Sequence, residues 1–176
     1  GWLPAQHVQL LLEHAGVRLS RSYSLTAVHA DGRIELAIKR HAGGQVSSHL
    51  LEHLAVGQVL ELGQAMGTLH WPQNAAAGVL LVAAGSGLTP LLGLLRQALA
   101  DGFSAPVTLL HYVRKRSQRA FSRELQALLA QHANLQVRWA ITGEPAQLDE
   151  LSGRFQASHI AGLPAASLLV CGPHGF

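Results

Sequence analysis

The chain has 176 residues, of which 48% are apolar and 13% are charged, and its formal net charge is +3 with histidine neutral. This length accommodates one large or two small domains with a proper core, and the apolar fraction excludes a disordered chain. The mild charge, without a long Lys/Arg stripe, argues against nucleic-acid binding. The single cysteine, Cys171, excludes a disulfide framework and an iron–sulfur cluster ligated within this chain, and it favours a reduced, cytoplasmic compartment.

No membrane span is predicted, because the longest apolar runs contain Gly and Pro and fall short of the ~18 residues of a span. No signal-peptide pattern opens the chain, and no metal site is predicted.

Apolar runs and alternating patterns predict strands over residues 7–13, 19–28, 33–39 and 58–62. Asp31-Gly32 predicts a two-residue hairpin, because both positions tolerate positive φ. Gly43-Gly44 ends the third strand, and residues 47–54 are predicted to form a short helix with Ser47 or Ser48 as its N-cap.

The small, polar residues 72–78 are interpreted as a linker, after which the pattern changes. The continuous apolar run over residues 79–84 is typical of a buried parallel strand. Further strands are predicted over residues 107–113, 135–141 and 167–171, helices over 90–99 and 121–132, and helical or irregular segments over 147–151 and 157–161. Strands that alternate with helices predict a parallel, doubly wound sheet.

Gly85-Ser86-Gly87 lies between a predicted strand and a predicted helix. Such a turn brings backbone N–H groups and a helix N-terminus against a phosphate. Pro90 suits the first helical turn, where its missing N–H has no partner in any case, and Thr89 is interpreted as a cap and hydroxyl donor. A turn that needs glycine only for steric reasons is the alternative, but the strand–turn–helix context favours a ligand.

Three further motifs are weaker by themselves. Arg21 and Tyr23 point to one side of a strand, and a guanidinium beside an aromatic ring suits an anionic, planar ligand, although a solvated strand face is the alternative. The glycines before Ser47 form a candidate phosphate nest or a plain β–α loop. Cys171-Gly172-Pro173 follows the last strand, at the rim where open α/β sheets bind ligands, and a buried structural cysteine is the alternative.

The order of these four motifs over residues 4–176 resembles the ferredoxin–NADP reductase superfamily. Among its members, the chain looks most like reductase components that pass electrons from a nicotinamide to an iron–sulfur domain. The resemblance implies an FAD-binding β-barrel domain at residues 1–72, N-terminally incomplete. It implies an α/β doubly wound parallel-sheet domain for NAD(P) at residues 78–176, C-terminally incomplete.

The resemblance also implies roles on the flavin side. Arg21 would hold the flavin pyrophosphate, Tyr23 would pack on the isoalloxazine, and Ser24 would act as a catalytic residue that hydrogen-bonds near the reactive N5. Lys39 would line the ribityl side. The FAD pyrophosphate would be capped at the short helix by Gly44, Val46 and Ser47.

On the nucleotide side, the resemblance implies two groups of residues. The dinucleotide would be bound near its pyrophosphate and nicotinamide by Gly85, Gly87 and Thr89. The nicotinamide would meet the flavin at Cys171, Gly172 and Pro173, with Cys171 as the second catalytic residue.

Arg114-Lys115-Arg116-Ser117 follows the second strand of the predicted parallel sheet. The adenosine ribose lies there in doubly wound folds, where an acid favours a free 2′-OH and arginine or serine favours a 2′-phosphate. The segment has bases and no acid, so Arg114 and Arg116 are expected to favour NADP, with NAD as the alternative cofactor. A solvated basic loop is the other interpretation.

The implied activity is hydride transfer from NAD(P)H to FAD, followed by transfer of single electrons to an iron–sulfur protein or a fused ferredoxin domain outside this segment. The flavin supplies the chemistry, so no general acid–base pair is required, and the sequence has no clustered carboxylate pair. Two alternatives stay open. One is an NADH-dependent reductase of an oxygenase or a haem domain, and the other is a non-catalytic nucleotide-binding module.

Overall fold

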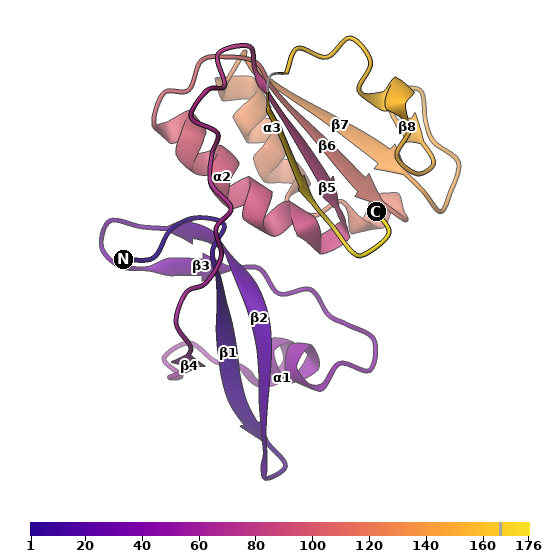
Figure 1. The fold of residues 1–176 in the computed structure, drawn as a ribbon. Coiled ribbons are helices and arrows are strands. Elements are labelled where there is room, and N and C mark those ends of the chain that lie inside the picture. The colour runs from indigo at the N-terminus through magenta and orange to yellow at the C-terminus, as the bar shows by residue number, and fades with distance from the viewer. Residues whose placement is uncertain (166) are drawn as a thin grey trace.

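The computed structural model describes residues 1–165 and 167–176, and the two halves of the chain build two sheets (Figure 1). We call residues 1–71 the antiparallel unit and residues 79–176 the parallel-sheet unit. The antiparallel unit contains strands β1 (His7–His14), β2 (Val17–Val28), β3 (Ile34–Leu36) and β4 (Glu61–Leu62), and helix α1 (Gln45–His53). Its curled antiparallel sheet has the strand order β3-β2-β1-β4 and agrees with the predicted β-barrel domain.

The long β1–β2 hairpin closes with two residues that the sequence pattern did not single out. His14 pairs with Val17, and the two residues between them, Ala15 and Gly16, have φ of 51° and 73°. Positive φ at both positions is the geometry of a type I′ turn, which follows the natural twist of the strands. The strand therefore begins at Val17, two residues before the predicted start, because the turn sets its boundary.

The predicted hairpin at Asp31-Gly32 is present, but its loop has three residues. The His29 N–H donates to the Arg33 carbonyl at 2.8 Å, and Gly32 has a φ of 87°. A glycine in the left-handed region is typical of three-residue hairpin loops. Beyond this loop β3 ends at Leu36, three residues before the predicted end, and β4 likewise has only the last two of its five predicted residues.

Helix α1 begins earlier than predicted, and neither serine is its N-cap. Gly44 occupies the N-cap position and no side chain caps the helix. The buried Ser47 hydroxyl instead accepts a hydrogen bond from the His41 N–H at 3.0 Å and lies 3.4 Å from the Gly44 carbonyl, to which it donates. Ser47 therefore shapes the loop that leads into α1.

The parallel-sheet unit contains strands β5 (Val79–Ala84), β6 (Val107–Val113), β7 (Leu135–Ile141), β8 (Leu151–Ser152) and β9 (Ser167–Cys171), and helices α2 (Leu88–Ala100) and α3 (Ser122–Gln131). The strand order is β8-β7-β6-β5-β9, and every adjacent pair is parallel. The chain winds away from β5 in both directions, which confirms the doubly wound topology. The short β8 was not predicted, because two residues carry no periodicity.

Both faces of this sheet are covered by apolar side chains. The whole of β5 and β6 is buried, and α2 and α3 pack on the face that includes Leu81 and Leu109. The opposite face is covered by Ile160 and Leu163 of the β8–β9 connection. Residues 72–78 contain neither helix nor strand, and among the described helices none is long and apolar enough to cross a membrane.

Helix α2 lies between the two units and contacts β2 closely (Figure 1). A Cβ at Gly93 would lie 2.7 Å from the Leu25 carbonyl oxygen, so only glycine permits this approach. One turn further on, Arg96 donates to the Thr26 carbonyl at 2.8 Å. The same guanidinium binds both Glu124 oxygens, at 2.5 and 2.7 Å, and Glu35 at 3.1 Å. Arg96 thereby links β2, β3 and α3.

Replacement of Arg96 by leucine is expected to lower the free energy of unfolding by about 1–2 kcal/mol, because Glu124 and the Thr26 carbonyl lose a charged donor. Urea unfolding followed by tryptophan fluorescence measures the change. Arg18→Leu is the matched control, because its ion pair with Glu61 is mostly exposed and should contribute under about 0.5 kcal/mol. Equal losses in the two variants would contradict the prediction.

Candidate active site

Two of the predicted motifs meet at the topological switch point of the parallel sheet. The chain leaves β5 through the Gly85 turn, and Cys171 ends the neighbouring strand β9, where it pairs with Ala83. A Cβ at Gly87 would lie 2.1 Å from the Cys171 carbonyl oxygen, so the two backbones are in direct contact. Ligands of open α/β sheets bind outside the carboxyl ends of strands at such a switch point.

Among the described residues, no side chain caps the start of α2, which follows the Gly85–Gly87 turn. Gly85 has a φ of 55°, and the helix begins at Leu88, which puts Pro90 in its first turn as predicted. The Thr89 hydroxyl donates to the Ser86 carbonyl at 2.9 Å, so Thr89 is not the N-cap, and no side chain caps this helix. The first backbone N–H groups of α2 therefore have no side-chain acceptor, as suits a site for an anionic group.

The segment after Cys171 folds back on the sheet. A Cβ at Gly172 would lie 2.8 Å from the Phe176 ring and 2.9 Å from the Ala84 Cβ, and the Phe176 N–H donates to the Pro173 carbonyl at 3.2 Å. Burial raises the pKa of the half-buried Cys171 thiol. The thiol is therefore protonated at neutral pH, which favours a packing role over a nucleophilic one.

The other two motifs meet in the antiparallel unit. Tyr23 packs on the cluster that contains Leu10 of β1 and Val46 of α1, which brings the Arg-x-Tyr-Ser strand beside the start of the helix. Burial raises the pKa of the Tyr23 phenol, and the Arg21 charge acts in the opposite direction, so the two side chains are neighbours. Arg21 is exposed and its guanidinium donates to the Ser20 carbonyl at 2.7 Å, which leaves further donors for an anion.

Three further predicted residues, Ser24, Lys39 and Gly44, lie in the antiparallel unit. Ser24 precedes Leu25, the residue that Gly93 approaches, and so lies at the junction of the two units. The charge of the exposed Lys39 makes a small contribution to lowering the pKa of the His111 imidazole. Gly44 is confined, since a Cβ there would lie 2.9 Å from the Ser47 hydroxyl oxygen.

The segment after β6 has no acid of its own, but carboxylates from another part of the chain lie beside Arg116. The Arg116 guanidinium makes two hydrogen bonds to Glu150, at 2.8 and 2.7 Å, and one to Glu144 at 3.1 Å. Arg119 also binds Glu150, and the hydrogen bonds from Arg116 are the largest cause of a lowered Glu150 pKa. These acids come from the segment after β7, which lies beside the segment after β6 because the two strands are parallel neighbours. The Arg114 side chain is exposed.

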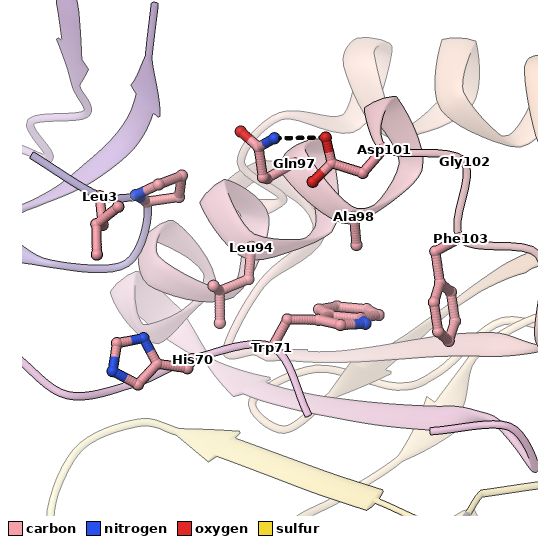
Figure 2. Close-up of a pocket in the computed structure, with 10 residues that line it drawn as sticks. Leu3, His70, Trp71, Leu94, Gln97, Ala98, Asp101, Gly102 and Phe103 are labelled. Carbon is pink, nitrogen blue, oxygen red and sulfur yellow. Dashed lines mark hydrogen bonds between the residues drawn. The ribbon is translucent and has the colours of Figure 1, made fainter. Parts of the chain in front are cut away.

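A separate pocket of about 360 Å³ lies toward the other end of α2 (Figure 2). It is formed by Leu3 of the N-terminal segment, by His70 and Trp71, and by the C-terminal half of α2 with its following loop. The Trp71 and Phe103 rings pack edge to face, with centroids 5.1 Å apart. The pocket therefore lies away from the Gly85 turn and contains none of the predicted site residues.

Sequence reasoning missed two structural contributors to the site. His111 is fully buried in β6 and its Nε2 lies 2.9 Å from the Gly85 carbonyl oxygen. A histidine inside an otherwise apolar strand was the available signal. Gly93 was hidden in an apolar helical run, where a glycine indicates close packing only when the partner is known.

Comparison with known families agrees with this geometry. Residues 1–71 match the family model of the oxidoreductase FAD-binding domain, and residues 81–176 match that of the oxidoreductase NAD-binding domain. The chain belongs to the ferredoxin–NADP reductase superfamily. The two matched domains identify FAD and NAD(P) as the cofactors, and the predicted two-part fold is that of this superfamily.

Two curated relatives are reductase components. The chain is 36% identical over 177 residues to the ferredoxin–NAD(+) reductase component of the alkene monooxygenase system of Xanthobacter autotrophicus, covering 98% of this chain and 53% of the relative. It is 30% identical over 152 residues to the naphthalene 1,2-dioxygenase system ferredoxin–NAD(P)(+) reductase component of Pseudomonas putida, covering 85% and 45%. This superfamily member thus spans about half the length of these relatives.

Among solved structures, the FAD/NAD-binding domain of nitric oxide dioxygenase from Vibrio cholerae has the same fold. It superimposes with a TM-score of 0.84 at 26% identity, covering 98% of this chain and 74% of that chain. The arrangement of the two units is therefore the one found in a flavin- and nicotinamide-binding domain of the superfamily.

Proposed function

We propose that the chain is the two-cofactor part of a reductase that takes a hydride from NAD(P)H onto FAD and delivers single electrons to an iron–sulfur acceptor. The contact between Gly87 and Cys171 carries the proposal, because it joins the two nucleotide-side motifs at the switch point. The junction at Gly93 and Leu25 holds the Arg-x-Tyr-Ser strand against the helix that starts at that site. Named relatives among reductase components of oxygenase systems support the same activity.

The residues of this chain position the cofactors, and they do not themselves take part in the hydride or electron transfer. A bound flavin would accept the hydride and release its electrons singly. Arg21 and the N-terminal region of α1, with Gly44 and Val46, are proposed to hold the FAD pyrophosphate, while Ser47 shapes that loop through its bonds to His41 and Gly44. The flavin ring system is assigned to Tyr23 and Ser24, and the ribityl side to Lys39.

On the nucleotide side, the N-terminus of α2, which has no side-chain cap among the described residues, suits the dinucleotide pyrophosphate. Gly85 and Gly87 are proposed to bind it through their backbone, with Thr89 holding the turn through Ser86. Cys171, Gly172 and Pro173 are proposed to border the nicotinamide and keep water from its reacting carbon.

The direct test is spectroscopic. The purified protein is incubated with FAD, freed of excess cofactor, and mixed with NAD(P)H without oxygen. We expect a flavin absorbance that is bleached by NAD(P)H and recovers on addition of a plant-type [2Fe–2S] ferredoxin. A protein that neither carries nor acquires flavin refutes the proposal.

The same experiment separates the alternatives. A protein that binds nucleotide without bleaching would be the non-catalytic module. A protein that is bleached by NADH and reoxidised only by an oxygenase or haem domain would be the second kind of reductase. One-electron artificial acceptors such as ferricyanide report the flavin step whichever partner is native.

NADPH is the proposed preferred donor, with the 2′-phosphate bound by Arg114 and by Arg116 once its pairs with Glu144 and Glu150 rearrange. Arg114→Ala is expected to lower kcat/KM for NADPH about tenfold and to leave that for NADH unchanged, because it removes one exposed phosphate contact. Arg123→Ala, which removes an exposed arginine on α3, is the control. A wild-type protein with a strong NADH preference would contradict this assignment.

An iron–sulfur partner and a cytoplasmic location are part of the proposal. The one cysteine of residues 1–176 cannot ligate a cluster, so an iron–sulfur acceptor would be a separate protein or a fused ferredoxin domain outside these residues. The free Cys171 thiol fits the reducing cytoplasm.

A further inference from the structure

His111 is a polar residue in the most buried part of the parallel sheet. It lies in β6 between Ala83 of β5 and Trp139 of β7, and it is 0% exposed. Its ring centroid lies 5.0 Å from that of Trp139. A polar group costs free energy in such a place unless it is hydrogen-bonded, so the bond that it makes indicates its role.

That bond goes to the Gly85 turn. Nε2 of His111 lies 2.9 Å from the Gly85 carbonyl oxygen, and a carbonyl oxygen only accepts, so Nε2 carries the hydrogen. Nδ1 is buried without a hydrogen-bond partner in the described part of the chain. Burial, with a smaller contribution from Lys39, lowers the pKa of His111 to about 4. The ring is therefore a neutral donor with a single tautomer.

The bond sets the direction of the turn. In a planar trans peptide the Gly85 C=O and the Ser86 N–H point in opposite directions. Because the carbonyl points into the sheet toward His111, the Ser86 N–H points away from it, toward the side on which Ser86 is exposed. The same carbonyl accepts from the N–H of Leu88, the first residue of α2. His111 thus connects the sheet to the turn and to the helix start.

We infer that His111 is a positioning residue for dinucleotide binding, which holds the Gly85–Gly87 turn in the orientation that receives the pyrophosphate. Gly87 is held from the other side by Cys171, so the turn is fixed between β6 and β9. His111 lies beneath the turn and is fully buried, so it would contact neither cofactor. The inference rests on the proposed function, since it concerns the same nucleotide site.

Two substitutions separate the hydrogen bond from packing. His111→Phe keeps a ring against Trp139 and removes the donor, whereas the amide of His111→Gln reaches as far as Nε2 and restores it. In the FAD-loaded protein, titration calorimetry with NADP+ and NAD+ should show binding about tenfold weaker in H111F, and within about threefold of wild type in H111Q. The stabilisation of Tm by either nucleotide should follow the same order, while FAD affinity stays equal in both variants.

Defined outcomes overturn the inference. Wild-type nucleotide affinity in H111F, or H111Q as weak as H111F, shows that the bond does not position the turn. Should H111F fail to fold, H111Q is compared with His111→Asn, whose shorter amide cannot reach Gly85, and equal affinities then refute it. A wild-type protein that takes up FAD but binds no nucleotide overturns the proposed function as well, whereas normal wild-type binding with an unaltered H111F overturns this inference alone.

Discussion

Substitution of Gly87 by alanine is expected to lower kcat/KM for NAD(P)H at least about a hundredfold. The new Cβ would lie 2.1 Å from the Cys171 carbonyl oxygen and 2.4 Å from its carbonyl carbon. These are backbone atoms of a strand that pairs with β5, so β9 and the turn have to separate. Overpacking of this kind costs about 1–3 kcal/mol, and a displacement of about 1 Å near reacting groups is enough for a hundredfold loss.

Steady-state kinetics with ferricyanide and calorimetric titration with NADP+ measure the effect. Flavin content should be retained, because the clash lies in the parallel-sheet unit. Ser86→Ala is the matched control, since this neighbour is exposed and its loss should change kcat/KM less than about threefold. A G87A variant with kinetics like those of S86A would show that close contact between the Gly85–Gly87 turn and Cys171 is not needed for activity.

Substitution of Gly93 by alanine is expected to slow flavin reduction at saturating NAD(P)H by about tenfold or more. The new Cβ would lie 2.7 Å from the Leu25 carbonyl oxygen and 3.3 Å from the Ala5 nitrogen, so the two units have to move apart. Nucleotide affinity should change little, because the Gly85 turn lies wholly within the parallel-sheet unit. Hydride transfer, which needs nicotinamide and flavin in contact across the junction, should be affected instead.

Stopped-flow bleaching of the flavin without oxygen gives the rate and the apparent Kd separately. Alanine is favoured over glycine in a helix by about 1 kcal/mol, so a loss of stability in G93A would have to exceed that gain. Gln97→Ala, at an exposed position on the same helix, is the control. An unaltered reduction rate in G93A would show that the junction does not set the distance between the cofactors.

Local patterns were sufficient for most of the fold. The continuous apolar run of β5 and the short apolar run of β9 placed both strands correctly, and Pro90 lies in the first turn of α2 as predicted. Boundaries were wrong where a turn or a cap decides them. Ala15 and Gly16 set the start of β2, and Gly44 starts α1 in place of either serine.

The contacts of the candidate site residues could not be predicted from the sequence. Arg116 was expected to be available for a phosphate, but its carboxylate partners lie 28 and 34 residues further along the chain. Ser47 was expected to face a pyrophosphate, but its hydroxyl bonds to His41 and Gly44. In both cases the partner comes from outside the local motif, and no periodicity reports it.

The Gly85–Pro90 turn illustrates which features the sequence determined and which depended on the tertiary structure. Its strand–turn–helix character and its glycines are local properties, because φ/ψ limits and side-chain period act over a few residues. Together with the order of the four motifs along the chain, they were sufficient to name the superfamily. Which groups hold the turn depended on packing. Cys171 reaches Gly87 because β9 lies beside β5, and His111 donates to Gly85 because β6 lies on the other side. Burial and the choice of neighbouring strands arise only when distant segments share one core. They determined the contacts of the turn, the tautomer of His111 and the partners of Arg116.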